Sequence, residues 1–474
     1  MGKKSCKGVE ALAAVEVRIN PEIFREYDIR GVAERDLTSD VVYTLGQAIG
    51  TFLQNAGEKE AIVGRDNRIS SPRLRDALVD GITSTGCNVL DIGVVITPAF
   101  YYARILYGIN GGAMITASHN PPEFNGFKVA FGPGTLYGEQ IQDLRKLAES
   151  GDFARDGRGR VSTAGPRDAY ISMLAGKIQL GPRRLKVAVD CGNGTASFFA
   201  GDLMHKLGCD VIPLYCESDP GFPNHFPDPV RPQNLGALID AVRSQGADLG
   251  VAYDGDGDRI GVVDEKGDII WGDRLMVLFW REILPKHPGA TAIIEVKCSQ
   301  ALVEEVERLG GKPMFYRTGH SLIKAKMREI GAVFTGEMSG HMFFADEYYG
   351  FDDALYASAR LLRILSNTDA TLSELLGDVP KYPATPETRV PCPDREKFNV
   401  VRSIQEHFKA LYPVIDIDGA RIIFPSGWGL VRASNTGPEL VVRAEAKTGD
   451  ALDKIKKEIE DALRSFPAVG AVRW

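Results

Sequence analysis

The sequence has no long apolar run: no stretch reaches the roughly 20 residues that a membrane-spanning helix requires. Its first residues, MGKKSCKGVE, lack the apolar core of a signal peptide, and Cys6 stands where an N-myristoylation pattern requires Ser or Thr. We therefore expect a solvated tail there. The 7 cysteines are scattered and form no CxxC pair, so neither a zinc site nor a disulfide framework is indicated. These absences favour a cytoplasmic protein with no membrane partner.

The chain also lacks an excess of positive charge. It has 56 Lys and Arg against 63 Asp and Glu, a formal net charge of −7, which argues against a nucleic-acid partner. A local basic site for an anionic metabolite remains open. With 474 residues and 51 glycines the chain is too long for one ordinary core, so we expect several turn-rich globular domains.

Three segments, 61–92, 186–215 and 292–316, follow one plan: apolar strand, polar loop, helix, glycine turn and second strand. Such units favour sheets that contain parallel strand pairs, with helices packed on them. The plan predicts three related α/β domains with mixed sheets. We favour duplication of one ancestral domain; the alternative is that the three similar units arose independently, without common ancestry.

The last hundred residues differ from the rest. KYPATPETRVPCP (381–393) reads as a proline-rich linker, followed by a helix, two strands and a charged closing helix from Asp450. This pattern predicts a smaller α+β domain. The expected domains are therefore 1–164, 165–267, 268–380 and 381–474.

The stretch ITASHNPPEFNGFKV places Ser118 between an apolar run and a turn. Pro121 and Pro122 stiffen the backbone and supply no N–H, while Asn125-Gly126 tolerates positive φ. Such a loop holds a side chain at the end of a strand, where α/β ligand sites lie. The flanking residues lack the glycines of a GxSxG nucleophile elbow, and an ordinary surface turn is the alternative.

The stretch DLGVAYDGDGDRIGVVDE alternates acidic residues with glycine at the end of an apolar strand. Glycine lets the backbone turn tightly, so that three carboxylates face one point; they are Asp254, Asp256 and Asp258. Packed carboxylates repel unless a hard cation such as Mg²⁺ neutralises them. An EF-hand competes because Glu265 falls at loop position twelve, but Arg259 replaces the glycine required at position six. A metal-free acidic turn is the other alternative.

The stretch FTGEMSGHMFF carries Glu337, Ser339 and His341 in a glycine-flanked loop after a strand. A glutamate can accept hydrogen bonds from the vicinal hydroxyls of a sugar, and His341 is either a proton carrier or a structural histidine. Upstream, Lys297 follows a strand and His320 opens a helix, positions that suit an anion.

The stretch GWGLVRASNTGPELVVRAEA packs one cation and three neutral donors between two strands; they are Arg432, Ser434, Asn435 and Thr436. This composition can hold a phosphate, although it also suits a plain turn. Taken together, a serine without a visible triad, a cation site and a phosphate loop indicate phosphoryl transfer. That reaction relies on positioning and charge neutralisation.

At this point the sequence resembles a family. ITASHNPPEFNGFKV, DGDGDR, GEMSGH and RASNTGP, in this order, are similar to motifs of the α-D-phosphohexomutases. FREYDIRG, GRDNRISSP and VDCGNG add to the likeness, which runs from about Ile23 almost to the C-terminus. Within the family, GEMSGH resembles the phosphomannomutase/phosphoglucomutase branch. The resemblance implies four domains around a central cleft, with the fourth as a lid.

The resemblance also implies a mechanism. Ser118 would carry a phosphoryl group and pass it to a hexose phosphate, forming a hexose 1,6-bisphosphate that reorients and returns its other phosphoryl group. One Mg²⁺ per chain would bridge the Ser118 oxygen and Asp254, Asp256 and Asp258. Lys128 and His341 are the implied acid/base pair, and His119 would position the phosphate.

The resemblance assigns the substrate residues by motif. Glu337 and Ser339 would read sugar hydroxyls, and the distal phosphate would be held by Arg432, Ser434, Asn435 and Thr436. The sugar-phosphate path would be lined by Tyr27, Arg30, Arg259, Lys297, Thr318, Gly319 and His320. The expected partners are small sugar phosphates, and the chain is expected to be a monomer or weak dimer.

Three alternatives stay open. The first is a phosphoglucosamine mutase, or a mutase that prefers glucose to mannose. The second is a sugar phosphatase, in which water would attack the phosphoserine. The third is a sensor of sugar phosphates without catalytic activity.

Overall fold

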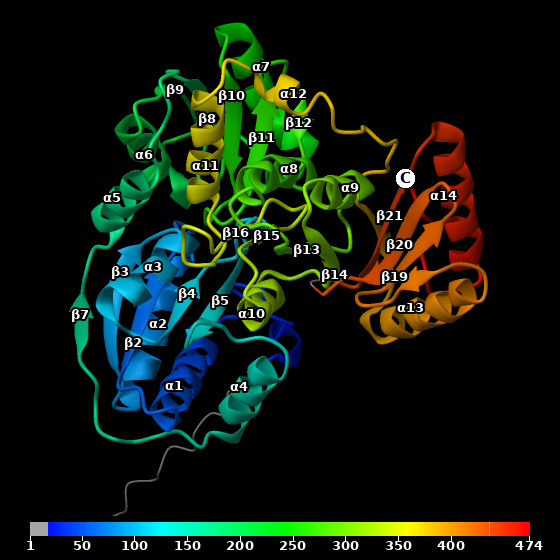
Figure 1. Cartoon of the computed structure of the whole chain (residues 1–474). Helices are drawn as coiled ribbons and strands as arrows, with labels where there is room; N and C mark the ends of the chain where they lie inside the picture. The colour runs from blue at the N-terminus through cyan, green and yellow to red at the C-terminus, as the bar shows by residue number, and fades with distance from the viewer. Residues whose placement is uncertain (1–17, 436) are drawn as a thin grey trace, which may run out of the picture.

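Four β-sheets follow one another along the chain in the computed structural model of the protein, which describes residues 18–435 and 437–474. Figure 1 shows the first three sheets with their helices as neighbouring units and the C-terminal unit at the right. The expected N-terminal tail with Cys6, and Thr436, lie outside the described residues. No helix in the described part of the chain is long and apolar enough to cross a membrane.

The first unit holds a mixed seven-stranded sheet in the order β1-β5-β4-β2-β3-β7, with β6 on β5. Its central strand β2 is buried along almost its whole length, as expected of a parallel strand covered by helices on both faces. The strands are β1 (Ile29–Val32), β2 (Glu60–Arg65), β3 (Asn88–Val94), β4 (Gly111–Ile115), β5 (Phe124–Phe131), β6 (Gly134–Thr135) and β7 (Val161–Thr163). The helices are η1 (Pro21–Ile23), α1 (Ser39–Asn55), α2 (Ser71–Ser84), α3 (Thr97–Tyr107) and α4 (Glu139–Ser150).

The second unit has a five-stranded sheet in the order β12-β11-β10-β8-β9, parallel on one side and antiparallel on the other. Its strands are β8 (Lys186–Asp190), β9 (Asp210–Leu214), β10 (Leu249–Tyr253), β11 (Ile260–Asp264) and β12 (Ile269–Ile270). The helices are α5 (Arg167–Lys177), η2 (Thr195–Phe198), α6 (Ala200–Lys206), η3 (Pro232–Leu235) and α7 (Gly236–Gln245).

The third unit has a four-stranded mixed sheet in the order β14-β13-β15-β16. Its strands are β13 (Thr291–Glu295), β14 (Lys312–Tyr316), β15 (Phe334–Gly336) and β16 (Met342–Phe344). The helices are α8 (Gly272–Ile283), α9 (Gln300–Arg308), α10 (His320–Ile330), α11 (Ala354–Ser366) and α12 (Leu372–Leu375). Helix α11 lies beside the second sheet (Figure 1), where Tyr253 Oη and Ser358 Oγ are 2.8 Å apart.

The three predicted strand–helix–strand segments are present. They are β2–α2–β3, β8–α6–β9 and β13–α9–β14, and the two strands of each are parallel neighbours. One hydrophobic core runs through all three units and includes Phe100, Phe199 and Phe279. These units are therefore tied together by shared packing, and the predicted α/β fold with mixed sheets is confirmed.

The fourth unit is an antiparallel sheet in the order β17-β21-β20-β19-β18, with its own core. Its elements are β17 (Thr388–Pro391), α13 (Asp394–Lys409), β18 (Val414–Ile415), β19 (Ala420–Phe424), β20 (Gly427–Ala433), β21 (Glu439–Ala446) and α14 (Gly449–Leu463). The proline-rich stretch was expected to be a linker up to residue 393, but its end forms β17, paired with β21. Pro391 is tolerated because β17 is an edge strand.

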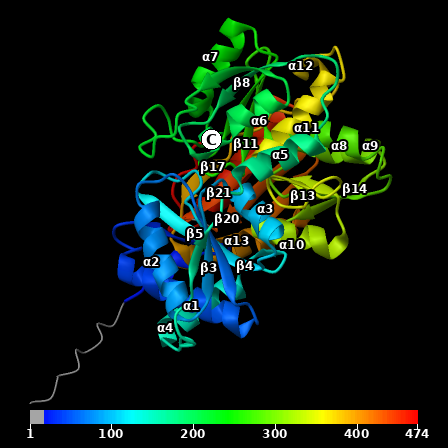
Figure 2. The same ribbon diagram turned by 90° about the vertical axis from the view of Figure 1, so that its left-hand side faces the viewer.

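A small separate cluster joins the fourth unit to the third. Trp428 packs with Val296 and Leu430, and its Nε1 donates to Glu445 Oε1 at 2.9 Å. The Arg421 guanidinium lies 3.7 Å from the Trp428 ring centre and donates to the carbonyls of Val296 and Cys298. Figure 2, turned by 90°, shows the strands of this unit behind the first three units. This apolar cluster is small compared with the core that units one to three share.

We predict that Trp428→Ala loosens the fourth unit, because truncating a buried tryptophan costs about 3–5 kcal/mol of stability. Trypsin cleavage after the exposed Lys381 should become faster while far-UV circular dichroism at 25 °C changes little. Phe398→Ala, at a side chain 57% exposed, is the matched control and should cleave like the parent. Equal cleavage rates for all three proteins would show that this contact does not secure the unit.

Candidate active site

Ser118 follows β4 in the left-handed region of backbone space, with φ of 50°. Its N–H donates to Thr116 Oγ1 at 2.9 Å, which fixes the turn. The side chain is buried, and Oγ lies 2.6 Å from Asp254 Oδ2 and 3.0 Å from His119 Nδ1. A residue with positive φ other than glycine is uncommon and is concentrated at functional sites. The predicted serine loop is therefore held in one unusual conformation.

Arg68, which is fully buried, organises this loop from the inside. Its guanidinium donates to the carbonyls of Ser118 and Asn120 at 2.8 and 2.7 Å, and also to those of Pro121 and Phe124. Asp66 accepts from Arg68 Nε at 3.1 Å and balances the charge. The planar guanidinium can serve several acceptors at once, which suits one residue to setting a whole loop.

The three aspartates lie in a hairpin loop between β10 and β11, which are antiparallel. All three side chains are fully buried, and their carboxylate oxygens lie within 4.8 Å of one another. Asp254 Oδ1 accepts from the N–H groups of Asp258 and Arg259 at 3.0 and 3.1 Å, so the loop wraps around its first carboxylate.

The EF-hand alternative is excluded by this geometry. The loop is flanked by strands, and Glu265 accepts instead from the Ser373 N–H at 3.2 Å.

Cationic and neutral donors surround the carboxylates. Lys128 Nζ donates to Asp256 Oδ2 at 2.8 Å and also to Asp258, and Thr97 Oγ1 donates to Asp256 Oδ2 at 2.6 Å. Burial raises the pKa of Asp254, and the neighbouring carboxylates raise it further. Burial also opposes the charge on Lys128, but Asp256 and Asp258 outweigh it and hold its pKa well above the usual value.

The oxygens at this site fit a hard divalent cation. Asp256 Oδ1 and Asp258 Oδ1 are buried and have no hydrogen-bond partner among the described residues. Such atoms are costly to bury unless something satisfies them. An all-oxygen donor set suits Mg²⁺ better than a softer metal. The acidic triad can therefore hold a metal ion.

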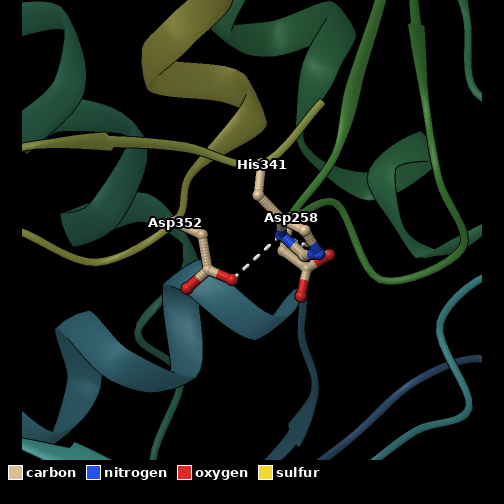
Figure 3. A group of neighbouring side chains, drawn as sticks. All are labelled: Asp258, His341 and Asp352. Atoms are coloured by element: carbon tan, nitrogen blue, oxygen red, sulfur yellow. Dashed lines mark ion pairs between the residues drawn. The ribbon is translucent and has the colours of Figure 1, made fainter. Parts of the chain in front are cut away.

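His341 lies next to the triad and also beside a fourth buried aspartate, Asp352. Its Nε2 accepts from Arg259 Nε at 2.9 Å, which places the proton of a neutral ring on Nδ1. Figure 3 shows Nδ1 directed toward Asp352, whose Oδ2 is 3.1 Å away, and Asp258 Oδ1 lies 3.6 Å from the same nitrogen. Asp352 is itself paired with Lys324 Nζ at 2.9 Å.

A chain of contacts leads from this cluster to the predicted distal phosphate loop. His341 Nε2 is 4.0 Å from Glu337 Oε2, and Glu337 Oε1 accepts from the Gly319 N–H at 2.7 Å. The neighbouring Thr318 N–H donates to Asp418 Oδ2 at 2.9 Å, and Arg432 Nε donates to the same oxygen at 3.0 Å. Residues of all four units are thus linked from Ser118 to Arg432.

The other predicted site residues lie around this series of contacts. Arg30 Nη1 donates to Asn120 Oδ1 in the serine loop at 2.7 Å, and the Tyr27 ring meets the His320 ring edge-on at 5.1 Å. Lys297 Nζ donates to Glu387 Oε2 at 2.9 Å. Ser339 and Asn435 are half-buried, and Ser434 is buried. Thr436 lies outside the described residues.

Sequence reasoning missed four residues that shape the site, namely Arg68, Thr97, Asp352 and Asp418. Arg68 belongs to the GRDNRISSP stretch, which contributed only to the family likeness. Its spacing of 50 residues from Ser118 carries no periodic signal. Thr97 opens a helix and contacts Asp256 across 159 residues, so nothing local distinguishes it.

We predict that Arg68→Lys impairs the serine loop, because an ammonium cannot serve four carbonyls and unpaired buried acceptors cost about 1–3 kcal/mol each. Turnover should fall at least about tenfold and the thermal midpoint should drop. Arg395→Lys, at an arginine on α13 whose side chain is 86% exposed, is the control and should behave like the parent. Unchanged turnover and midpoint in Arg68→Lys would mean that the loop holds its shape without this residue.

Comparison with known proteins gives a consistent result along the whole chain. Four family descriptions match: phosphoglucomutase/phosphomannomutase alpha/beta/alpha domains I, II and III over 21–155, 168–267 and 271–382, and the C-terminal domain over 387–462. A phosphomannomutase/phosphoglucomutase of Pseudomonas putida is 45% identical over 93% of this chain and 95% of its own. A phosphoglucomutase of Neisseria gonorrhoeae is 42% identical over 95% and 98%.

A more distant relative and a solved structure extend this picture. A probable phosphoglucosamine mutase of Methanopyrus kandleri is 36% identical over 92% of this chain and 96% of its own. The crystal structure of a phosphoglucomutase/phosphomannomutase family protein from Burkholderia thailandensis superposes with a TM-score of 0.89 at 41% identity. It covers 96% of this chain and 100% of that one. The chain therefore belongs to the phosphoglucomutase/phosphomannomutase family.

Proposed function

We propose that this protein interconverts hexose 1-phosphates and hexose 6-phosphates of mannose or glucose, with Ser118 as the phosphoryl carrier and a hexose 1,6-bisphosphate as the intermediate. The contact between Ser118 Oγ and Asp254, at 2.6 Å, carries this proposal. It brings a potential phosphoryl acceptor from one unit against a buried carboxylate triad from another. Family membership supports the same reaction.

The triad fits one Mg²⁺ per chain, held by Asp254, Asp256, Asp258 and the Ser118 oxygen. Bound there, the ion would neutralise the charge that develops on the transferring phosphoryl group. Asp254 would present Oδ2, since its Oδ1 is already engaged by two main-chain N–H groups. The partnerless oxygens of Asp256 and Asp258 supply further donors.

Ser118 is suited to carrying phosphate rather than to attacking an acyl group. Its Oγ partners are a carboxylate and His119, and they do not form a Ser-His-Asp series. Burial lowers the pKa of His119 well below its usual value, and the positive charges of Arg259 and Arg30 lower it further. A neutral His119 can therefore position a phosphate without drawing it into a tight ion pair.

Glu337 and Ser339 are proposed to form hydrogen bonds with the sugar hydroxyls. Burial raises the pKa of Glu337, while the N–H of Gly319 orients one of its oxygens. The other oxygen lies on the side of His341. We assign His341 and Lys128 to proton transfer with the substrate hydroxyl, and Arg259 holds the tautomer of His341 that accepts at Nε2.

Arg432, Ser434, Asn435 and Thr436 are the proposed clamp for the phosphate that does not react. Arg432 is buried and balanced by Asp418, and its Nη2 has no partner among the described residues. A clamp made mostly of neutral donors does not favour one end of the substrate strongly. That property suits an intermediate that must reverse its orientation before the second transfer. Tyr27, Arg30, Lys297, Thr318 and His320 are assigned to the path between the clamp and Ser118.

We place the domain boundaries near residues 165, 268 and 380, with the fourth domain as a lid. The small apolar cluster around Trp428, separate from the core of the other three units, supports a unit that moves relative to them. We also propose that the protein is cytoplasmic and acts as a monomer or weak dimer on small sugar phosphates.

Two other activities would differ from the proposed one in their preferred substrate or in their product. A phosphoglucosamine mutase would prefer the amino sugar, and the GEMSGH loop with its glutamate favours the hexose branch instead. A sugar phosphatase would release inorganic phosphate, and it would have little use for the adaptable clamp around Arg432. The 45% identical relative is named for both mannose and glucose, which supports the proposed substrate pair.

The proposed function predicts conversion of mannose 1-phosphate and glucose 1-phosphate to their 6-phosphates, faster than conversion of glucosamine 1-phosphate. Ser118→Ala should reduce turnover by several orders of magnitude, because the phosphoryl carrier is lost. Intact mass should show a phosphate of about 80 Da on the parent protein, mapped to Ser118 and absent from Ser118→Ala. Ser150→Ala, at the exposed end of α4, is the control. Full turnover in Ser118→Ala would refute the phosphoserine mechanism, and preference for the amino sugar would refute the assigned branch.

Asp256→Asn should weaken cation binding, because it replaces one charged oxygen donor by a neutral one. Activity at saturating substrate should then require a higher Mg²⁺ concentration, and chelation should abolish it in both proteins. Asp240→Asn, on α7 outside the triad, is the charge-matched control. An unchanged Mg²⁺ requirement in Asp256→Asn would place the activating ion elsewhere.

A further inference from the structure

Two cysteines that are 25 residues apart in sequence meet beyond the ends of two neighbouring strands. Strands β8 and β9 are parallel, with Asp190 opposite Leu214, and Cys191 and Cys216 follow them. Their sulfurs are 3.3 Å apart, compared with the roughly 2.05 Å of a disulfide bond. The Cys191 N–H also donates to the Leu214 carbonyl at 3.1 Å, which fixes the two chains side by side.

The two cysteines differ in their accessibility. Cys191 is buried, whereas Cys216 is half-buried and lines a cavity of about 520 Å³ beside Arg167, Phe198 and His205. A small reagent would therefore meet Cys216 first. The hydrogen bond with the Cys191 thiol lowers the pKa of Cys216, which favours the thiolate, the reactive form of cysteine. Among the cysteines in the described part of the chain, no other two sulfurs are in hydrogen-bond contact.

The backbone next to this pair contacts the active site directly. The Cys191 carbonyl accepts from the Gly194 N–H at 2.8 Å, and the Thr195 N–H donates to the Gly255 carbonyl at 3.0 Å. Gly255 stands between Asp254 and Asp256 in the metal-binding loop. Thr195 Oγ1 also accepts from the Asn67 N–H at 3.2 Å, next to Arg68. A shift of the 191–195 turn would therefore displace the aspartate loop.

The turn is held in an uncommon conformation. Asn193 and Tyr215 have φ of 58° and 51°, in the left-handed region that favours glycine, and the Asn193 N–H donates to the Tyr215 carbonyl at 2.9 Å. Each of the two segments thus passes through a residue in a sparsely populated backbone region. Closing the sulfurs by more than 1 Å would draw on rotation of the two side chains and on movement of this turn.

We propose that Cys191 and Cys216 form a reversible disulfide that displaces the aspartate loop and lowers mutase activity, an effect on activity that rests on the function proposed above. The oxidant is a small organic disulfide. The Cys216 thiolate attacks one sulfur of the reagent, releasing one thiol and forming a mixed disulfide. The Cys191 sulfur then displaces the second thiol. Two electrons pass from the cysteines to the reagent, and the two thiol protons leave on the released thiols.

The experiment treats the full-length protein with 2-hydroxyethyl disulfide and compares it with Cys191→Ser, Cys216→Ser and Cys209→Ser. The last is the control, because it removes a cysteine from the same stretch of chain without touching the pair. After alkylation of free thiols, mass spectrometry should show a loss of two hydrogens and a bond between residues 191 and 216 in the parent and in Cys209→Ser. The two other variants should not form it.

Hydrogen exchange at residues 193–196 and 254–259 should change only where the bond forms, and dithiothreitol should reverse the change. Turnover should fall at least about tenfold in the parent and in Cys209→Ser, since misplacing reacting groups by about 1 Å can lower the rate about a hundredfold. Absence of the bond, or a lasting adduct at Cys216 alone, would overturn the proposal. So would a bond that leaves hydrogen exchange unchanged. These mass and exchange readouts do not depend on mutase activity, so they decide the proposal even if the sugar assay fails.

Discussion

The loops that carry Ser118 and the three aspartates touch through their main chains, and the rest of the site depends on that contact. A side-chain carbon added at Gly255 would lie only 2.3 Å from the Ser118 carbonyl oxygen, so a larger residue there would force the loops apart. The same carbonyl accepts from Arg68. Two loops from different units are thereby brought close enough for Ser118 Oγ to reach Asp254. Positioning of this kind, together with electrostatic stabilisation, accounts for most of the rate enhancement in phosphoryl transfer.

Charge balance is the second constraint. Three fully buried carboxylates repel one another in a medium of low dielectric, and burial together with this repulsion raises the pKa of Asp254. Lys128 offsets part of the charge, and Lys324 does the same for Asp352 behind His341. The remaining negative charge faces Ser118, where it would stabilise a cation, and the cation in turn would stabilise a phosphate. The network therefore suits the phosphoryl-carrying role proposed for Ser118, which requires no catalytic triad.

Much of the candidate site could be predicted from the sequence, because the motifs that form its loops are short and local. The alternation of aspartate with glycine predicted a convergent acidic loop, and Asn-Pro-Pro after an apolar run predicted a fixed serine. The unpredicted parts are contacts over long separations. Arg68 reaches Ser118 across 50 residues, and Asp352 meets His341 from a loop with no motif. Strand β17 was not predicted because its prolines suggested a linker, although an edge strand tolerates proline. The Cys191–Cys216 contact follows from the parallel pairing of β8 and β9, which sequence spacing does not reveal.

The proposed convergence of Ser118 and the three aspartates on one cation can be tested directly. Anomalous diffraction from crystals grown with Mn²⁺ in place of Mg²⁺ would locate the ion without reference to activity. One peak per chain should appear within coordination distance, about 2.1 Å, of Asp254, Asp256, Asp258 and the oxygen on Ser118. A peak at other residues, or no peak at the triad at saturating Mn²⁺, would contradict it.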